Sequence, residues 1–181
     1  MNSMGFLVWF LPVIFMMHDF EEIIMAEVWG NRFNQKIQRL FPGRRPFGLG
    51  KNHAWYTPVL SIAVGLEFLL FSVICFFSVS YQNYFLWFSA FLGLIIHMAF
   101  IHIAVCFPFK GYVPGVVTSI ASLPPAIIVF ATAINCLKYS AGTILVAGIL
   151  GIILLAVLLP ALHGFMRVTD LWLDRYSKRT D

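Results

Sequence analysis

The chain has 181 residues, of which 60% are hydrophobic and only 11% are charged. About a quarter of the residues in ordinary soluble domains are charged, so this composition excludes such a domain and predicts an integral membrane protein. The net charge of +4 does not indicate nucleic-acid binding, because the basic residues cluster beside apolar segments, as they do in membrane proteins.

Five apolar segments are each long enough to cross a bilayer, which takes about 20 apolar residues in a helix. They cover residues 5–29, 57–77, 84–107, 113–137 and 141–166. The first lacks a basic leader and a small-residue cleavage site, so we expect a mature helix rather than a secretory signal. The sequence therefore predicts an all-α fold, with residues 1–181 forming a single transmembrane domain of about five membrane-spanning helices.

The stretch 30–56 is the only long polar segment between spans, and its first part has the pattern of an amphipathic helix. Its apolar residues share one helical face, with basic residues to one side: Trp29, Phe33, Ile37, Leu40 and Phe41, beside Arg32, Lys36 and Arg39. This pattern predicts a helix lying in the membrane interface.

Charge predicts the orientation of the bundle. Eleven of the twelve Lys and Arg residues fall in the 30–56 loop, the 108–112 loop and the 167–181 tail, which leaves only Lys138 on the other side. By the positive-inside rule the N-terminus is outside and both the 30–56 loop and the tail are cytoplasmic. We expect a multi-pass protein of a bacterial-type plasma membrane.

The first span contains the run His18-Asp19-Phe20-Glu21-Glu22. Each charged residue at the centre of a membrane helix costs about 2.5–3.5 kcal/mol, so such groups are functional candidates. His18, Glu21 and Glu22 stand at i, i+3 and i+4, which places them on one helical face. Asp19 falls at the edge of that face, where we expect it to support a ligand rather than to be one.

Further histidines and carboxylates occur at related depths in other spans. Glu67, His97, His102 and His163, like His18 and Glu22, fall roughly 5–16 Å from the expected cytoplasmic end of their spans. Imidazole and carboxylate are ligands of zinc, non-haem iron and manganese. We therefore predict a metal site from His18, Glu22, His97, His102 and His163, with Glu21 and Glu67 as catalytic acid or base.

His97 and His102 pose a geometric problem. Five residues correspond to about 140° around an ideal α-helix. Both rings reach one centre only if that centre is large, if the helix is distorted, or if one ring supports a ligand instead of binding.

The His-x-x-Glu-Glu run near the start of a small polytopic chain resembles the HXXEE-domain family of membrane proteins. The later segment from His102 through Tyr112, with Pro114, Gly115, Val116, Val117 and Thr118, is similar to a second signature of that family. The resemblance covers roughly residues 5–165 and implies a metal-dependent membrane protein, without naming a substrate.

Structural interpretations stand beside these functional ones. The run at His18 could be a buried ion pair that fixes helix packing, and Glu67 could be a protonated acid bonded to a neighbouring helix. Arg44 and Arg45 are most simply topology signals, and contact with a lipid phosphate or an anionic substrate is the functional alternative.

Three functions fit the pattern. The leading hypothesis is a metal-dependent hydrolase of a lipidic or amphiphilic substrate at the cytoplasmic leaflet, with a divalent metal, zinc favoured over iron or manganese, and Glu21 as general base. The second is an oxidative enzyme with two metals, and the third is a metal or proton-coupled carrier. The sequence leaves the oligomeric state open.

Overall fold

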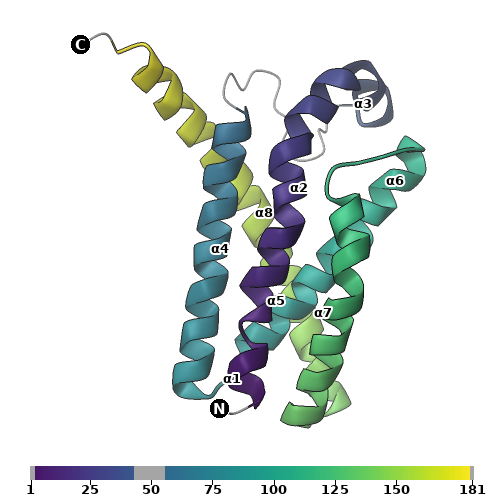
Figure 1. The fold of residues 1–181 in the computed structure, drawn as a ribbon, viewed down its shortest axis with the longest axis vertical. Helices are drawn as coiled ribbons and strands as arrows, with labels where there is room; N and C mark the ends of the chain where they lie inside the picture. Colours follow the sequence, from purple (N-terminus) through teal and green to yellow (C-terminus); the bar gives the residue numbers. More distant parts are fainter. Residues whose placement is uncertain (1–2, 43–55, 180–181) are drawn as a thin grey trace.

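The computed structural model describes residues 3–42 and 56–179. Every regular element within these ranges is a helix, and five helical stretches are long and apolar enough to cross a membrane. The elements are α1 (Ser3–Leu7), α2 (Phe10–Arg32), α3 (Asn34–Leu40), α4 (Tyr56–Tyr81), α5 (Phe85–Ile96), η2 (His97–His102), α6 (Ile103–Phe109), α7 (Val116–Leu137) and α8 (Ala141–Ser177). The expected all-α, multi-pass bundle is thus confirmed, and α1 begins at the opposite end from the end of α8 (Figure 1).

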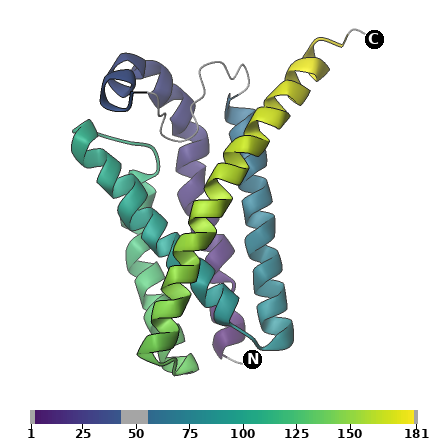
Figure 2. The same ribbon diagram turned by 180° about the vertical axis from the view of Figure 1, so that it is seen from behind.

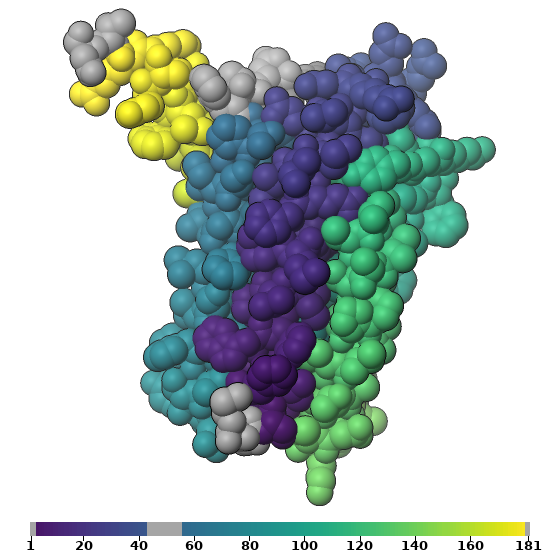
Figure 3. Space-filling view, viewed as in Figure 1, coloured from purple at the N-terminus to yellow at the C-terminus, as the bar shows by residue number. Residues whose placement is uncertain are grey.

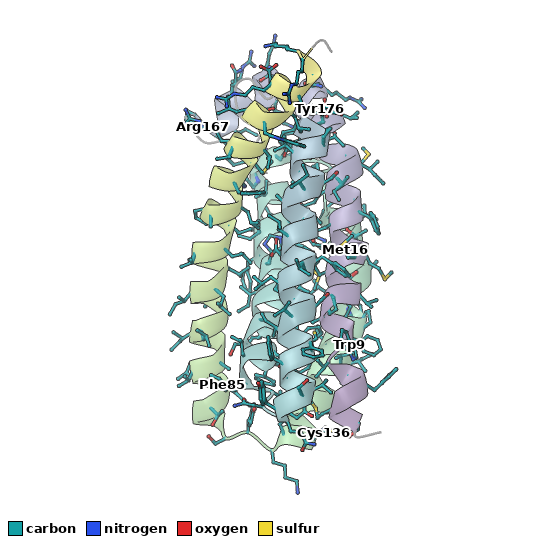
Figure 4. All side chains as sticks on the ribbon, turned by 90° about the vertical axis from the view of Figure 1, so that its left-hand side faces the viewer. Trp9, Met16, Phe85, Cys136, Arg167 and Tyr176 are labelled. Carbon is teal, nitrogen blue, oxygen red and sulfur yellow. The ribbon has the colours of Figure 1, made fainter. Side chains whose placement is uncertain are left out.

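Helix α2 occupies the middle of the bundle. Figure 3 shows it running between α4 and α7 on one face of the molecule, and it packs against both. Seen from the side, α4 lies between α2 and α8, with Arg167 and Tyr176 near one end and Cys136 at the other (Figure 4). This arrangement makes α2 the element on which neighbouring helices converge.

The first span is interrupted between α1 and α2. Pro12 has no N–H, so the carbonyl of Val8 loses its usual helical partner. That carbonyl accepts hydrogen bonds from Trp87 Nε1 at 2.8 Å and Cys75 Sγ at 3.2 Å. The proline therefore leaves this carbonyl only the longer i+3 bond from Leu11 N at 3.3 Å, and the donors on α4 and α5 complete its hydrogen bonding within the bilayer.

The amphipathic segment after the first span forms the short helix α3. Ile37 is buried, Leu40 is exposed, and Lys36 Nζ lies 4.0 Å from the ring centroid of Phe109 on α6. The helix thus packs on the end of α6, and residues 43–55 of the same loop lie outside the described residues.

Helix α8 is longer than the span expected at 141–166. It continues without a break to Ser177, giving a length of about 55 Å against a hydrocarbon core of about 30 Å. The tail is therefore an extension of the last span and not a separate helix. Figures 1 and 2 show its C-terminal turns leaving the bundle.

Glycines allow α5 and α8 to cross in near backbone contact. A Cβ on Gly151 would stand 2.5 Å from the Ser89 carbonyl oxygen and 3.0 Å from Gly93 N, and one on Gly93 would stand 3.1 Å from the Gly151 carbonyl oxygen. Small residues at membrane helix contacts permit this approach. The crossing is seen as an X in Figure 2, beyond which the two helices diverge.

We expect Gly151→Ala to lower the free energy of unfolding by about 1–3 kcal/mol, because the added methyl must push α5 and α8 apart. Thermal unfolding in detergent measures the change. Gly148→Ala is the matched control, since its Cβ would meet only the flexible Leu92 Cδ2 at 3.4 Å. Equal unfolding temperatures for the two variants would contradict the tight crossing.

Candidate metal centre

The two outer residues of the His18–Glu22 run point into the bundle. The His18 side chain is fully buried, and its Nε2 lies 3.4 Å from Glu22 Oε1 one helical turn later. The spacing i, i+4 on α2 is what brings an imidazole and a carboxylate to the same side of one helix.

A local change of helix type places His97 and His102 together. Residues His97–His102 form the π-helix η2, whose i→i+5 hydrogen bonding brings residues five apart onto one side. The two Nε2 atoms lie 2.8 Å apart. Of the three solutions open from the sequence, the structure contains the distorted helix.

Four ligand-type atoms meet where α2 faces η2. His102 Nε2 lies 3.1 Å from His18 Nε2 and 3.0 Å from Glu22 Oε1, and all four candidate atoms of this cluster, which includes His97, lie within 4.8 Å of one another. Ligand atoms at about 2.0–2.1 Å from a tetrahedral ion stand about 3.3 Å apart. The observed separations therefore suit a single metal ion.

His102 makes a hydrogen bond on the side of its ring that faces away from the cluster, and this bond fixes which of its nitrogens can act as an acceptor toward the cluster. His102 Nδ1 lies 3.0 Å from the carbonyl oxygen of Pro114, which only accepts, so Nδ1 carries the proton of the neutral ring. The Nε2 lone pair is then directed at Glu22 Oε1, another acceptor with no hydrogen-bond partner among the described residues. Two such acceptors repel unless a proton or a cation lies between them.

His18 is oriented through Thr118 at the start of α7. The Thr118 hydroxyl donates to Glu21 Oε2 at 2.6 Å, so its oxygen is available to accept from His18 Nδ1 at 3.3 Å. Ser119 Oγ lies 3.4 Å from the same nitrogen. These two hydroxyls hold the orientation of the His18 ring, whose Nε2 points to the cluster.

Glu21 therefore has contacts different from those expected. It turns toward α7, where it accepts the Thr118 backbone N–H at 2.7 Å and the Tyr112 hydroxyl at 2.8 Å. Burial, followed by the bond to the Glu21 carboxylate, raises the pKa of the Tyr112 phenol above its ordinary value. The carboxylate thus caps the first turn of α7. The role of general base expected for Glu21 stays a prediction, and these contacts with α7 do not favour it.

Glu27, about one and a half helical turns beyond Glu21 on α2, caps another helix. It accepts the backbone N–H of Thr57 at 3.1 Å and also the Thr57 hydroxyl, at the first turn of α4. Two carboxylates of α2 thus hold the starts of α7 and α4 on either side of the cluster.

Gly115 makes room for the two innermost rings. Its φ is +80°, and a Cβ there would stand 2.6 Å from His102 Nδ1 and 3.0 Å from His18 Cε1. Any other L-residue would be strained in this backbone conformation and would also collide with both rings. The sequence marked Pro114, Gly115 and Thr118 as part of a signature, but gave no sign of these roles.

The remaining candidate residues lie around the cluster without joining it. Asp19 and Glu67 are buried and His163 is exposed, and all three line the cavity beside Glu22 and His97. His163 as a ligand and Glu67 as a catalytic group stay predictions. Arg44 and Arg45 lie outside the described residues.

Fold and site together define a polytopic α-helical membrane protein with a buried His/Glu cluster. The chain belongs to the HXXEE family, since a family model described as "Protein of unknown function with HXXEE motif" matches residues 9–130. Comparison with curated proteins and with solved structures found no match. The resemblance drawn from the sequence is thus confirmed, and the activity has to be argued from the site.

We expect Gly115→Ala to weaken metal binding about 10–100-fold, because the methyl displaces the hydrogen-bonded rings of His102 and His18. Titration of the purified protein with Zn²⁺ against a competing chelator measures this. Gly111→Ala serves as the control, since its Cβ would meet only Phe109 Cδ1 at 3.8 Å. Unchanged affinity in Gly115→Ala would show that the rings do not need this clearance.

Proposed function

We propose that the protein is a metal-dependent membrane enzyme that hydrolyses a lipidic or amphiphilic substrate. His18, Glu22, His97 and His102 would hold one divalent ion. The observation that carries this proposal is the convergence of imidazole nitrogens and a carboxylate oxygen 2.8–3.4 Å apart in a buried place, where a shared proton or a bound cation can join them.

Zinc is favoured over iron or manganese. Three imidazoles and one carboxylate are ligands that zinc accepts, and the separations suit its tetrahedral geometry. A catalytic zinc ion can expand from four to five ligands, so Glu22 can stay bound while water or substrate joins the site. A metal ion there would polarise the bond to be cleaved and make water a good nucleophile near neutral pH.

The residues around the cluster supply the other needs of hydrolysis. Glu67 is buried and lines the same cavity as His97 and Glu22, so we assign it the transfer of the proton from the attacking water to the leaving group. Asp19 is also buried and lines the cavity together with Glu22 and Glu67. Glu21 acts through Thr118 by orienting His18, and is a positioning residue.

The oxidative alternative in its two-metal form receives less support. Two metals would need Glu21 as a further ligand, but Glu21 binds α7 instead. The part of the chain that the structure describes also contains one cluster with metal-ligand spacing. A single six-coordinate iron at the same residues is the oxidative form that remains. A carrier would use the same cluster and would move the metal across the membrane without substrate turnover.

We also propose the orientation with the N-terminus outside and the C-terminus cytoplasmic, in a bacterial-type plasma membrane. The ends of α2, α6 and α8 lie together at one end of the bundle (Figure 1), and Arg32, Lys110 and Arg175 stand at or next to these ends. Lys138 follows α7 at the other end. This distribution agrees with the positive-inside rule and would put the cluster nearer the cytoplasmic leaflet.

The two neighbouring glutamates should respond differently to substitution. We expect Glu22→Ala to lose the metal, whereas Glu21→Gln keeps one ion per chain with affinity lowered about tenfold, because it only orients His18. Elemental analysis and chelator competition on purified protein provide the measurement. Full metal retention in Glu22→Ala, or in His18→Ala, would refute the ligand assignment.

The hydrolytic role is tested by turnover of ester-linked and amide-linked single-chain lipids in detergent. We expect Glu67→Gln to keep the metal and lose about 10²–10⁴-fold in rate, as loss of a general acid or base does. Oxygen consumption by an iron-loaded protein would support the oxidative alternative, and zinc flux in proteoliposomes without lipid turnover would support the carrier.

A further inference from the structure

A cavity of about 350 Å³ lies between α2, α4, α5, η2 and α8. This volume is at the lower end of the roughly 300–1,000 Å³ of small-molecule sites. Its walls are aliphatic and aromatic except for one group of ionisable residues: Asp19, Glu22, Glu67, His97, His102 and His163. Such a lining suits a ligand that is mostly hydrocarbon and has one polar part.

The cavity is elongated along the membrane direction. Its wall on α8 runs from Gly151 to Met166, a rise of about 22 Å. One end stops at the close crossing of Gly93 and Gly151, which leaves no space for a ligand. Half of the hydrocarbon core is about 15 Å thick, so the cavity has the length of one leaflet together with its interface.

The polar groups divide this length into two parts. Between the crossing and His97 the wall is made of apolar side chains such as Phe71, Leu94 and Leu154. The ionisable group follows, and its member His163 lies on α8 about 18 Å from Gly151 and is exposed, between the apolar lining residues Leu162 and Met166. From the crossing onward the cavity is therefore first hydrocarbon and then polar, which is the order along a lipid from its tail to its head.

The cavity also reaches the surface of the bundle within the membrane. Leu70 on α4 and Ile101 on η2 line it and are exposed at the same time. Both lie inside spans, so their exposed faces meet lipid chains. A hydrocarbon chain can enter from the bilayer beside these residues without passing through water.

We infer that the cavity binds the alkyl chain of a single-chain amphiphile from one leaflet, with the chain end at the Gly93–Gly151 crossing. The bond to be cleaved would lie beside His97 and Glu22, and the head group would extend toward His163. Only the position of the reacting bond rests on the proposed function. The binding of the chain rests on the shape and lining of the cavity.

The test uses the purified full chain in nanodiscs, with chelator present so that no metal is needed. The probe is a monoacylglycerol with a diazirine at the methyl end of its chain, whose uncharged head avoids repulsion by Asp19, Glu22 and Glu67. After photolysis, peptide mass spectrometry locates the label. We expect it on residues around the crossing, between Ala90 and Leu94 or near Gly151. Label confined to lipid-facing positions such as Ile152 would overturn the inference.

Two adjacent substitutions on α8 provide a matched pair. Leu154→Trp fills the closed end, whereas Ile153→Trp adds the same ring at a position that is 51% exposed and outside the lining. We expect Leu154→Trp to weaken binding of long chains about fourfold for each methylene excluded, to spare short chains, and to leave the zinc content unchanged. Ile153→Trp should match the wild-type protein.

The result separates the two proposals. Equal long-chain binding by Leu154→Trp, by a second filling variant Leu155→Phe and by wild-type protein would overturn the chain site, whatever the metal content. Absence of metal from wild-type protein, together with the expected labelling, would overturn the proposed hydrolase and leave the chain site standing.

Discussion

The structure depends on a cluster of imidazole and carboxylate groups that the fold holds close together in its buried interior. Nitrogen and oxygen atoms of His18, His102 and Glu22 lie 3.0–3.4 Å from one another in a buried part of the bundle. Burial lowers the local dielectric, so polar groups there are costly unless they are paired. The Pro114 carbonyl and the Gly115 backbone hold the imidazole rings in these positions, which is the arrangement that the proposed cation site requires.

The three glutamates of α2 contact three different neighbouring helices. Glu21 holds α7 through Thr118, Glu27 holds α4 through Thr57, and Glu22 faces η2. Charged groups are expensive in a membrane unless they are paired, and here each carboxylate accepts from, or lies beside, a polar group of another helix. The same contacts that stabilise the bundle therefore set the distance between α2 and η2.

The sequence predicted the parts of this arrangement that follow from periodicity and depth. Apolar length predicted the five spans, and the depth of His18, Glu22, His97 and His102 predicted that they would meet. It assigned Glu22 to the metal and Glu21 to catalysis, but both fit the i, i+3, i+4 face, and only the position of α7 shows that Glu21 turns to Thr118 instead. The π-helix at His97 and the clearance at Gly115 likewise depend on tertiary contacts that no local pattern encodes.

The residues proposed as metal ligands and the wall of the cavity come from different elements. His18, Glu22, His97 and His102 lie on α2 and η2, inside the stretch 9–130 that the family model matches, whereas α8 begins only at Ala141, after that stretch ends. Side chains on α8 line a long side of the cavity and supply none of the cluster atoms. Under the proposed function, recognition of the substrate would therefore be separate from the chemistry, and related chains could alter the last helix to suit other tails while the cluster stays the same.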